Sequence, residues 1–214
     1  MENPVAAVQP RTDGRQRILK KATELFAQAG YEGTSLSQIA TAAGMRKPSL
    51  LYHFDSKEAL RKEVLAEFFT HWRELLPSVL AQTRGGEDRF TVLMEACVNF
   101  LTEDPNRARL FVREAMDNPE AFSAEMTEQL TPWLALVARA IEEGQRSGVV
   151  RKEVNAEAFI LQMVRLAMTH FAMTGVISAF MPTTDQPTDR SLEELLRIGQ
   201  VALFSPHEEA SKNG

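Results

Sequence analysis

The sequence predicts an all-α protein of about nine helices. Apolar residues recur three and four positions apart in nearly every segment, which is the spacing of one face of an α-helix. No segment shows the sustained alternation of apolar and polar residues that is typical of a half-buried strand. The 214 residues include ten prolines and eleven glycines, so the chain has room for long helices between these breaking residues.

The first predicted helix spans residues 13–29. The apolar residues on its buried face are Ile18, Ala22, Leu25, Phe26 and Ala29. Gly30 follows at the position of a C-terminal cap, where glycine tolerates the left-handed backbone that ends many helices.

Two short helices and a long one follow. Ser35 and Gln38 have the spacing of a capping box, and the buried stripe of the helix that they begin consists of Leu36, Ile39, Ala40 and Ala43. Gly44 ends this helix, and Pro48 is well suited to the first turn of the next, which we expect to run to Phe54. Asp55 or Ser56 caps the long helix, with Glu58 in its first turn and Pro77 at a predicted kink or end.

The rest of the chain predicts five further helices, over residues 88–103, 106–116, 121–146, 156–181 and 190–204. We therefore expect a flexible arm (1–12), an N-terminal three-helix head (13–60), a C-terminal helical bundle (61–206), and a frayed tail (207–214).

Charge differs between the two parts. Residues 1–60 contain eight Lys or Arg and six Asp or Glu, whereas the remainder contains sixteen and twenty-three. A weakly basic head on an acidic body places the surface that attracts phosphates at one end of the chain.

Composition indicates a cytoplasmic protein. Cys97 is the single cysteine, so no intrachain disulfide can form, as suits a reducing compartment. We find no apolar run of the roughly eighteen residues that a membrane span needs, and no apolar core of a signal peptide at the N-terminus. We expect no membrane partner.

Residues 35–54 predict a helix-turn-helix, in which one short helix supports a second that enters the major groove of DNA. The second short helix is polar, and the side chains on or just before it that can donate to phosphates or base edges are Arg46, Lys47, Ser49, Tyr52 and His53. Thr34 and Ser35 add hydroxyls at the start of the first short helix. Spacing alone also permits an ordinary helical hairpin.

Residues 18–60 resemble the DNA-binding head of the tetracycline-repressor (TetR) family. The resemblance rests on these residues at consistent spacing: Ile18-Leu19, Ala22, Leu25-Phe26, Gly30-Tyr31, Gly33-Thr34-Ser35, Ile39-Ala40, Ala43-Gly44, Leu50, Tyr52-His53-Phe54, Ser56-Lys57 and Leu60. It implies a homodimer on double-stranded DNA with a palindromic operator, released by a small-molecule effector.

The resemblance also implies roles for single residues. Ser37 and Lys47 approach base edges, and the residues expected at phosphates are Thr34, Ser35, Tyr52, His53 and Lys57. The expected core of the head is Phe26, Ile39, Leu50 and Phe54. Leu51 stands where most members have a tyrosine that contacts phosphate, and here the tyrosine comes one residue later. Packing on the fourth helix is the alternative for Tyr52, and a packing role is the alternative for His53.

Two sets of residues in the body are candidates for contacts with partners. Small and apolar residues on the last two helices predict a dimer interface, with an intrachain core as the alternative: Ala172, Gly175, Ala179, Leu192, Leu195, Leu196, Gly199 and Leu203. Aromatic, Met and His residues on the middle helices predict an effector pocket, again with core as the alternative: Phe69, Trp72, Phe100, Phe111, Trp133, Met163 and His170. The expected effector is apolar or aromatic, anchored by His170 or Arg165.

Signatures of enzymes and metal sites are absent from the sequence. There is no phosphate-binding glycine loop and no nucleophile elbow, and the four histidines are scattered. We therefore expect a DNA-binding transcriptional regulator, most simply a ligand-released repressor, with no catalytic residues, cofactor or metal. The alternative is a helical small-molecule-binding or enzymatic bundle whose head no longer binds DNA.

Overall fold

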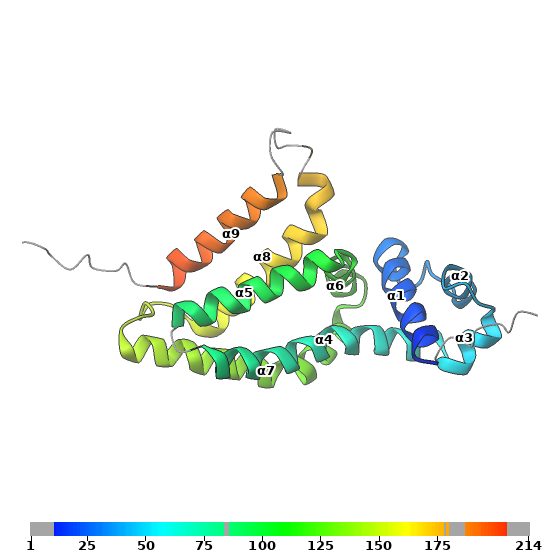
Figure 1. Cartoon of the computed structure of the whole chain (residues 1–214), viewed down its shortest axis with the longest axis horizontal. Helices are drawn as coiled ribbons and strands as arrows, with labels where there is room; N and C mark the ends of the chain where they lie inside the picture. The colour runs from blue at the N-terminus through cyan, green and yellow to red at the C-terminus, as the bar shows by residue number, and fades with distance from the viewer. Residues whose placement is uncertain (1–10, 84–85, 178, 180–186, 205–214) are drawn as a thin grey trace, which may run out of the picture. The chain divides into compact units, whose positions relative to one another are not determined.

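In the computed structural model, residues 11–83, 86–177, 179 and 187–204 are described, and they form nine helices and no strand (Figure 1). The helices are α1 (Arg11–Ala29), α2 (Leu36–Ala42), α3 (Lys47–His53), α4 (Lys57–Gln82), α5 (Gly86–Glu103), α6 (Asn106–Asp117), α7 (Pro119–Ser147), α8 (Ala156–Ile177) and α9 (Pro187–Leu203). The predicted all-α class and the predicted order of helices are confirmed.

The chain divides into two compact units after Phe68, within α4. We call residues 11–68 the head and the described residues from Phe69 onward the body, and we treat each by itself. The boundary predicted from the sequence lies at residue 60, where α4 has only just begun. The predicted arm at 1–12 falls mostly on residues outside the described part of the chain, and the predicted tail at 207–214 falls wholly outside it.

The head is held together by apolar side chains from all four of its helices. All four residues predicted for its core are buried, namely Phe26, Ile39, Leu50 and Phe54. Ile18 and Leu19 of α1 and Leu60 of α4 are also fully buried. Each such side chain stabilises the folded head by about 1.5–3 kcal/mol relative to exposure.

Local hydrogen bonds set the ends of the head helices as the sequence predicts. The Ser35 hydroxyl accepts from the Gln38 amide at 3.2 Å, and the Gln38 side chain accepts from the Ser35 amide at 2.7 Å, which completes the capping box. Ser56, rather than Asp55, caps α4, because its hydroxyl accepts from the Ala59 amide at 3.0 Å. Gly44 has a φ of 70°, the left-handed conformation in which glycine avoids steric strain.

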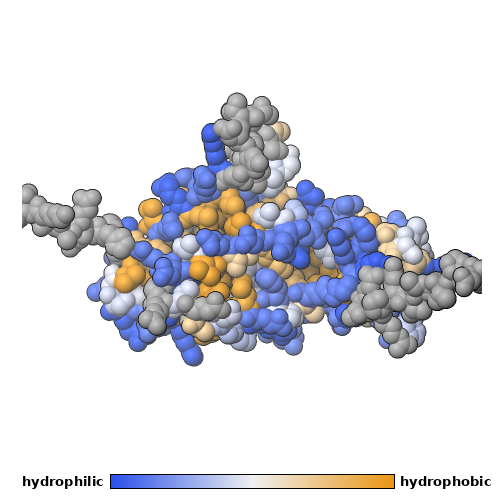
Figure 2. All heavy atoms as spheres, viewed as in Figure 1, coloured by the Kyte–Doolittle hydropathy of each residue, from blue (hydrophilic) through white to orange (hydrophobic). Residues whose placement is uncertain are grey.

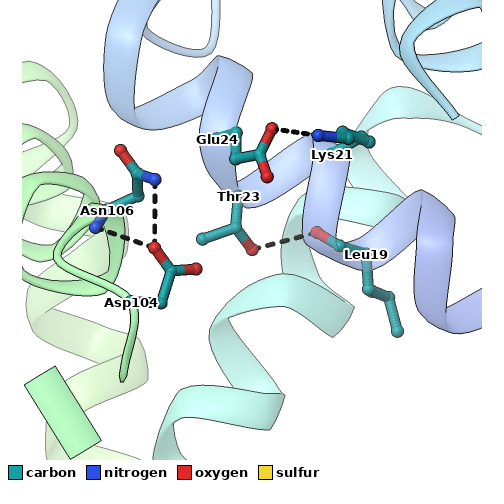
Figure 3. A network of polar contacts seen from close by, with 6 residues as sticks. All are labelled: Leu19, Lys21, Thr23, Glu24, Asp104 and Asn106. Atoms are coloured by element: carbon teal, nitrogen blue, oxygen red, sulfur yellow. Dashed lines mark hydrogen bonds and ion pairs between the residues drawn. The ribbon is translucent and has the colours of Figure 1, made fainter. Parts of the chain in front are cut away.

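Figure 3 shows further local bonds of this kind. In α1, the Thr23 hydroxyl donates to the Leu19 carbonyl, and Lys21 pairs with Glu24 at 2.6 Å. In the body, one Asp104 oxygen accepts from both the backbone and the side chain of Asn106, each at 3.0 Å. Asp104 therefore satisfies an otherwise free amide at the start of α6, where the sequence predicts a break.

Pro77 lies inside α4, which continues to Gln82, so the alternative that α4 ends at Pro77 was wrong. Proline removes one helical hydrogen bond and disturbs the preceding turn, at a cost of about 3 kcal/mol. Pro77 itself is exposed, and Trp72 and Val79 on the same helix are buried. Burial of such residues offsets the lost hydrogen bond.

The body is built around α8, which packs against α5, α6, α7 and α9. Its main cluster of buried side chains includes Phe90, Ile141, Ile160 and Met163. The end of α9 is joined to the α7–α8 connection by a bridge between Val150 and Phe204, and Arg151 donates from its Nε to the Phe204 carbonyl at 2.8 Å. These contacts fix the end of α9 against the α7–α8 connection.

One of the described helices, α8, is long and apolar enough on average to cross a membrane, although its apolar run is interrupted. The stretch Ala156–Val176 is 21 residues long with a mean hydropathy of 1.2, enough by length and composition alone. Six polar residues interrupt the stretch, namely Glu157, Gln162, Arg165, Thr169, His170 and Thr174, yet its average hydropathy stays high. The core helix of a soluble protein passes the same test, and Ile160, Met163 and Phe171 of α8 are buried in the body.

Candidate nucleic-acid interface and ligand-binding residues

The second helix of the helix-turn-helix, α3, presents polar side chains to solvent from a buried support. Leu50 is fully buried and Phe54, directly after α3, is buried too, so one face of α3 is attached to the core of the head. The exposed polar residues on or beside this helix are Arg46, Lys47, Ser49 and Tyr52. The exposed fraction of Tyr52 is 72%, so most of this side chain is open to solvent, which favours a DNA contact over packing on α4.

His53 and Leu51 are less exposed to solvent than Tyr52. His53 is half-buried beside α1: its Nε2 lies 3.5 Å from the point that a Cβ on Gly14 would occupy. Its ring also meets the Tyr52 ring edge to face, with centroids 5.6 Å apart. Leu51 is 37% exposed, so it presents an apolar side chain where most relatives are expected to have tyrosine. Ser37 on α2 is exposed.

Thr34 is buried, which removes its side chain from the surface where we expected a phosphate contact. Its hydroxyl lies 2.8 Å from the Gly30 carbonyl and 3.2 Å from the Leu25 carbonyl. The last carbonyls of a helix have no partner within it, and a buried hydroxyl needs one. Thr34 therefore closes the end of α1. Ser35 remains exposed, although its hydroxyl is engaged in the capping box.

Lys57 also makes its contacts within the head. Its Nζ donates to the Tyr31 carbonyl at 2.8 Å and to the Thr34 carbonyl at 3.1 Å. The same nitrogen lies 4.1 Å from the centroid of the Tyr31 ring. A lysine that bridges two carbonyls of the α1–α2 loop from α4 holds the helix-turn-helix in place, and two of its three donors are used within the head.

Sequence reasoning missed the contacts that join α1 to α4. Arg15 pairs with Glu63 at 2.8 Å, and its guanidinium lies 5.2 Å from the centroid of the Phe54 ring. Gln16 donates to Glu67 at 3.2 Å. These partners are about fifty positions apart in the sequence, so no local spacing rule indicates them.

In the body, aromatic contacts join the predicted effector residues in smaller groups. Phe69 and Phe111 both meet Phe122, with ring centroids 6.5 and 5.0 Å away. Trp72 meets Phe100 edge to face at 5.4 Å. Trp133 packs against the cluster that contains Met163. The predicted set therefore consists of side chains that pack on one another and on their neighbours.

Three ring nitrogens in the body are buried without a hydrogen-bond partner in the described part of the chain. They are Nε2 of His71, Nε1 of Trp133 and Nε2 of His170. Burial lowers the pKa of His170, and burial together with the Arg107 charge lowers the pKa of His71, so both imidazoles favour the neutral form. Buried polar atoms usually have partners, so these nitrogens are available to a polar group of a ligand. His71 was missed because it stands alone in the sequence; it stacks on Phe100 at 4.1 Å.

The predicted dimer stripe of α9 faces inward. Leu195 and Leu203 are buried, and a Cβ on Gly199 would approach the side chains of Met163 and Phe90 to 2.7 Å. These three residues therefore belong to the core of their own chain, the alternative noted for this stripe. Leu192, Leu196 and Ala172 are half-buried, whereas Gly175 and Ala179 are exposed.

A different apolar face of α8 and α9 is exposed. Its members, here called the α8–α9 face, are Leu161, Leu166, Met173, Val176, Ile198 and Val201, each 43–57% exposed. Figure 2 likewise shows apolar side chains at the surface of the body where α5, α8 and α9 are drawn. α8 packs against α5, α6, α7 and α9, yet four of its large apolar side chains remain exposed in this face, namely Leu161, Leu166, Met173 and Val176.

Comparison with known proteins decides the family. Residues 18–64 match the family described as bacterial regulatory proteins, tetR family, and residues 87–199 match the tetracyclin repressor-like C-terminal domain. This chain belongs to the tetR family.

Individual members are similar over most of their length. The regulator RutR of Escherichia coli K12 is 30% identical over 194 residues, which cover 87% of this tetR-family chain and 84% of RutR. The repressor DhaR of Mycobacterium sp. GP1 is 27% identical, with 85% and 99% covered. The structure of FadR from Bacillus subtilis in complex with stearoyl-CoA shares the fold, with a TM-score of 0.69, 17% identity, and 87% and 98% covered.

The tetR-family chain shows no metal-binding arrangement in its described residues, where no three His, Cys, Asp or Glu side chains come together. Burial raises the pKa of the Cys97 thiol to about 12, so this cysteine is protonated at neutral pH and is a poor nucleophile.

Proposed function

We propose that this protein is a sequence-specific DNA-binding regulator that acts as a homodimer and is released from its operator by a small apolar or aromatic molecule. The observation that carries the proposal is α3: a seven-residue helix fixed to the core by Leu50, with exposed Arg46, Lys47, Ser49 and Tyr52 around it. Such side chains can reach phosphates and base edges together when the helix enters the major groove.

We assign the DNA contacts within the helix-turn-helix to the side chains that are exposed to solvent. Arg46, Lys47, Ser37 and Ser49 have exposed side chains suited to bases or phosphates, and Tyr52 supplies an exposed hydroxyl. His53 and Ser35 contribute from the edge of this surface. Thr34 and Lys57 support the helices from within the head.

Dimerisation through the α8–α9 face is supported by its exposure and its composition. One helix-turn-helix reads few base pairs, so a two-fold dimer on a palindromic operator suits a protein of this kind. An isologous interface between two copies would cover the same apolar side chains on each. The half-buried Leu192, Leu196 and Ala172 and the exposed Gly175 and Ala179 would lie at its edges.

Effector binding is supported by the buried aromatic groups of the body. Phe69, Trp72, Phe100, Phe111 and Met163 supply apolar surface, and the unpartnered nitrogens of Trp133 and His170 supply polar contacts. A related fold holds stearoyl-CoA, and DhaR is named a repressor. Repression relieved by the effector, in the cytoplasm where DNA is accessible, is the function that these features favour.

The test is fluorescence anisotropy with DNA from upstream of the protein's own gene, against scrambled DNA, over a salt series. We expect tighter binding to the specific DNA and an affinity that falls steeply as salt rises. Lys47→Met should reduce the salt slope by up to about two for a dimer, because each copy loses one cation from the surface that meets the DNA. Lys152→Met, an exposed lysine of the body, is the matched control and should leave the slope unchanged.

If the protein binds neither DNA at low salt, the next experiment is to select binding sites from a pool of random DNA sequences. Such a pool tests for an operator that lies elsewhere in the genome. Failure there would overturn the proposal in favour of a helical ligand-binding bundle. If DNA binds, the same assay identifies the effector as the compound that releases it.

A further inference from the structure

A pocket opens in the body beside the buried cluster that contains Met163. It lies among α4, α5, α7 and the end of α9, has a volume of about 70 Å³, and is lined by apolar side chains together with one cation, Arg89. Its apolar walls include Phe90, Val137, Ile141 and Phe204. None of the seven side chains predicted for the effector lines it.

The walls of this pocket are fixed by contacts with one another and with Arg151. Phe204 is joined to Val150 by a backbone bridge, and its carbonyl accepts from Arg151 Nε at 2.8 Å. The Phe90 ring meets the Phe204 ring edge to face at 5.8 Å. Because these side chains are held in place, a ligand would enter an existing cavity and would not have to create one.

Arg89 is poorly satisfied where it stands. Its Nε is buried without a hydrogen-bond partner, and its terminal nitrogen reaches the Thr83 carbonyl at 3.5 Å, the long limit for such a bond. No carboxylate of the described residues forms an ion pair with it. A guanidinium donates through five N–H groups and pairs best with a planar carboxylate. An anionic group in the pocket would supply the missing acceptor.

We propose that this pocket is a second ligand site, which binds a short apolar monocarboxylate with the carboxylate on Arg89 and the hydrocarbon part against Phe90 and Ile141. A volume of about 70 Å³ holds roughly five to seven water molecules, which suits a ligand of about that many non-hydrogen atoms. Pentanoate has this size. The proposal concerns the body alone and stands whether or not the head binds DNA.

The experiment is isothermal titration of the full-length protein with pentanoate, and with pentanamide as a neutral molecule of nearly the same shape. We expect a dissociation constant of about 1 mM or below for pentanoate, as for a good ligand of fragment size. Pentanamide should bind at least about tenfold more weakly, because it lacks the charge that pairs with Arg89. This comparison uses the unaltered protein and so does not depend on how any variant folds.

Variants then locate the site. Arg89→Gln should weaken pentanoate about tenfold or more and abolish the preference over pentanamide, while Arg89→Lys should keep part of that preference. Ala140→Leu, which fills the pocket from α7, should weaken both molecules. Arg109→Gln, an exposed arginine on α6, is the matched control and should change neither. Circular dichroism verifies the fold of each variant.

The proposal is overturned if pentanoate at about 10 mM, ten times the expected dissociation constant, gives neither heat of binding nor thermal stabilisation of the protein. Equal affinities for pentanoate and pentanamide would also overturn it, as would a folded Arg89→Gln variant that binds pentanoate like the unaltered protein.

Discussion

Lys57 illustrates how a single basic residue serves the fold of a DNA-binding head. Its ammonium group bridges the carbonyls of Tyr31 and Thr34 and lies over the Tyr31 ring. Both carbonyls belong to the loop between α1 and α2, so one side chain of α4 determines where α2 begins. The charge of Lys57 would suggest a phosphate contact, whereas its observed hydrogen bonds are to two carbonyls of the head.

The contacts of Lys57 predict a loss of stability when its charge is removed. Lys57→Met should lower the free energy of unfolding by about 1–2 kcal/mol, because two charge-assisted hydrogen bonds are lost at a half-buried site. The exposed Lys62→Met is the matched control and should change it by less than about 0.5 kcal/mol. Urea denaturation measures both.

The same variant distinguishes this role from a phosphate contact. If Lys57 supports the fold of the head and does not contact DNA, the salt slope of DNA binding stays unchanged in Lys57→Met. A reduced slope at unchanged stability would instead assign Lys57 to the DNA, as the family resemblance implies.

His170 makes the stability of the body depend on pH. Burial lowers its pKa below the ordinary 6.5, so as pH falls through 6.5 the unfolded chain takes up a proton that the folded chain still refuses. The unfolded state then binds more protons, and the free energy of unfolding falls with pH down to the folded pKa.

His170→Phe should therefore flatten the dependence of stability on pH below 6.5, because it removes this titration. Urea denaturation at a series of values from about pH 5 to 8 measures the effect. Thr169→Ala, on the exposed side of α8, is the control and should leave the dependence as in the unaltered protein. Parallel curves for His170→Phe and the unaltered protein would contradict the prediction.

At the scale of elements, the position of α2 depends on the close turn that follows α1. Gly30 ends α1 with a φ of 75°, and Gly33 then passes directly over the helix end. A Cβ on Gly33 would lie 2.3 Å from the Ala29 carbonyl oxygen, which is part of the backbone and cannot rotate away. The turn therefore requires glycine for space.

Gly33→Ala should destabilise the head by about 1–3 kcal/mol, the usual range for inserting a methyl group where no space exists. It should also weaken DNA binding, since the loop carries Thr34 and Ser35, which close α1 and begin α2. Glu32→Ala, an exposed neighbour, is the matched control. Thermal denaturation and anisotropy measure the two effects, and a Gly33→Ala variant of normal stability would show that the loop yields without cost.

At the scale of the whole molecule, the outstanding surface is the α8–α9 face. Six large apolar side chains share it, although α8 and α9 already bury their opposite sides in the body. Large apolar side chains exposed on two neighbouring helices are candidates for an interface between two copies.

Leu166→Glu and Ile198→Glu should each convert the protein into a monomer, because two-fold symmetry places every introduced carboxylate in the interface twice. Sedimentation equilibrium should then give half the mass of the unaltered protein, and operator affinity should fall at least tenfold. Val92→Glu, at a similarly exposed apolar residue of α5, is the control and should remain dimeric. A dimeric, folded Leu166→Glu variant would move the interface elsewhere.

The sequence by itself determined the helices and much of the head. Capping residues such as Ser35 and the αL glycines act on atoms within a few positions, so local spacing is enough to find them. The burial of Phe26 and Leu50 follows from helical period, since these residues belong to the continuous apolar faces of short helices.

Tertiary structure alone decided which neighbour covers each face. The stripe that contains Leu195 and Gly199 could have met a second copy, yet it packs on Met163 and Phe90 of the same chain. Likewise the Arg89 pocket and the bonds of Lys57 join residues far apart in sequence. The period of a helix shows which side chains share a face, but it carries no information on what lies opposite, because that depends on how the helices pack.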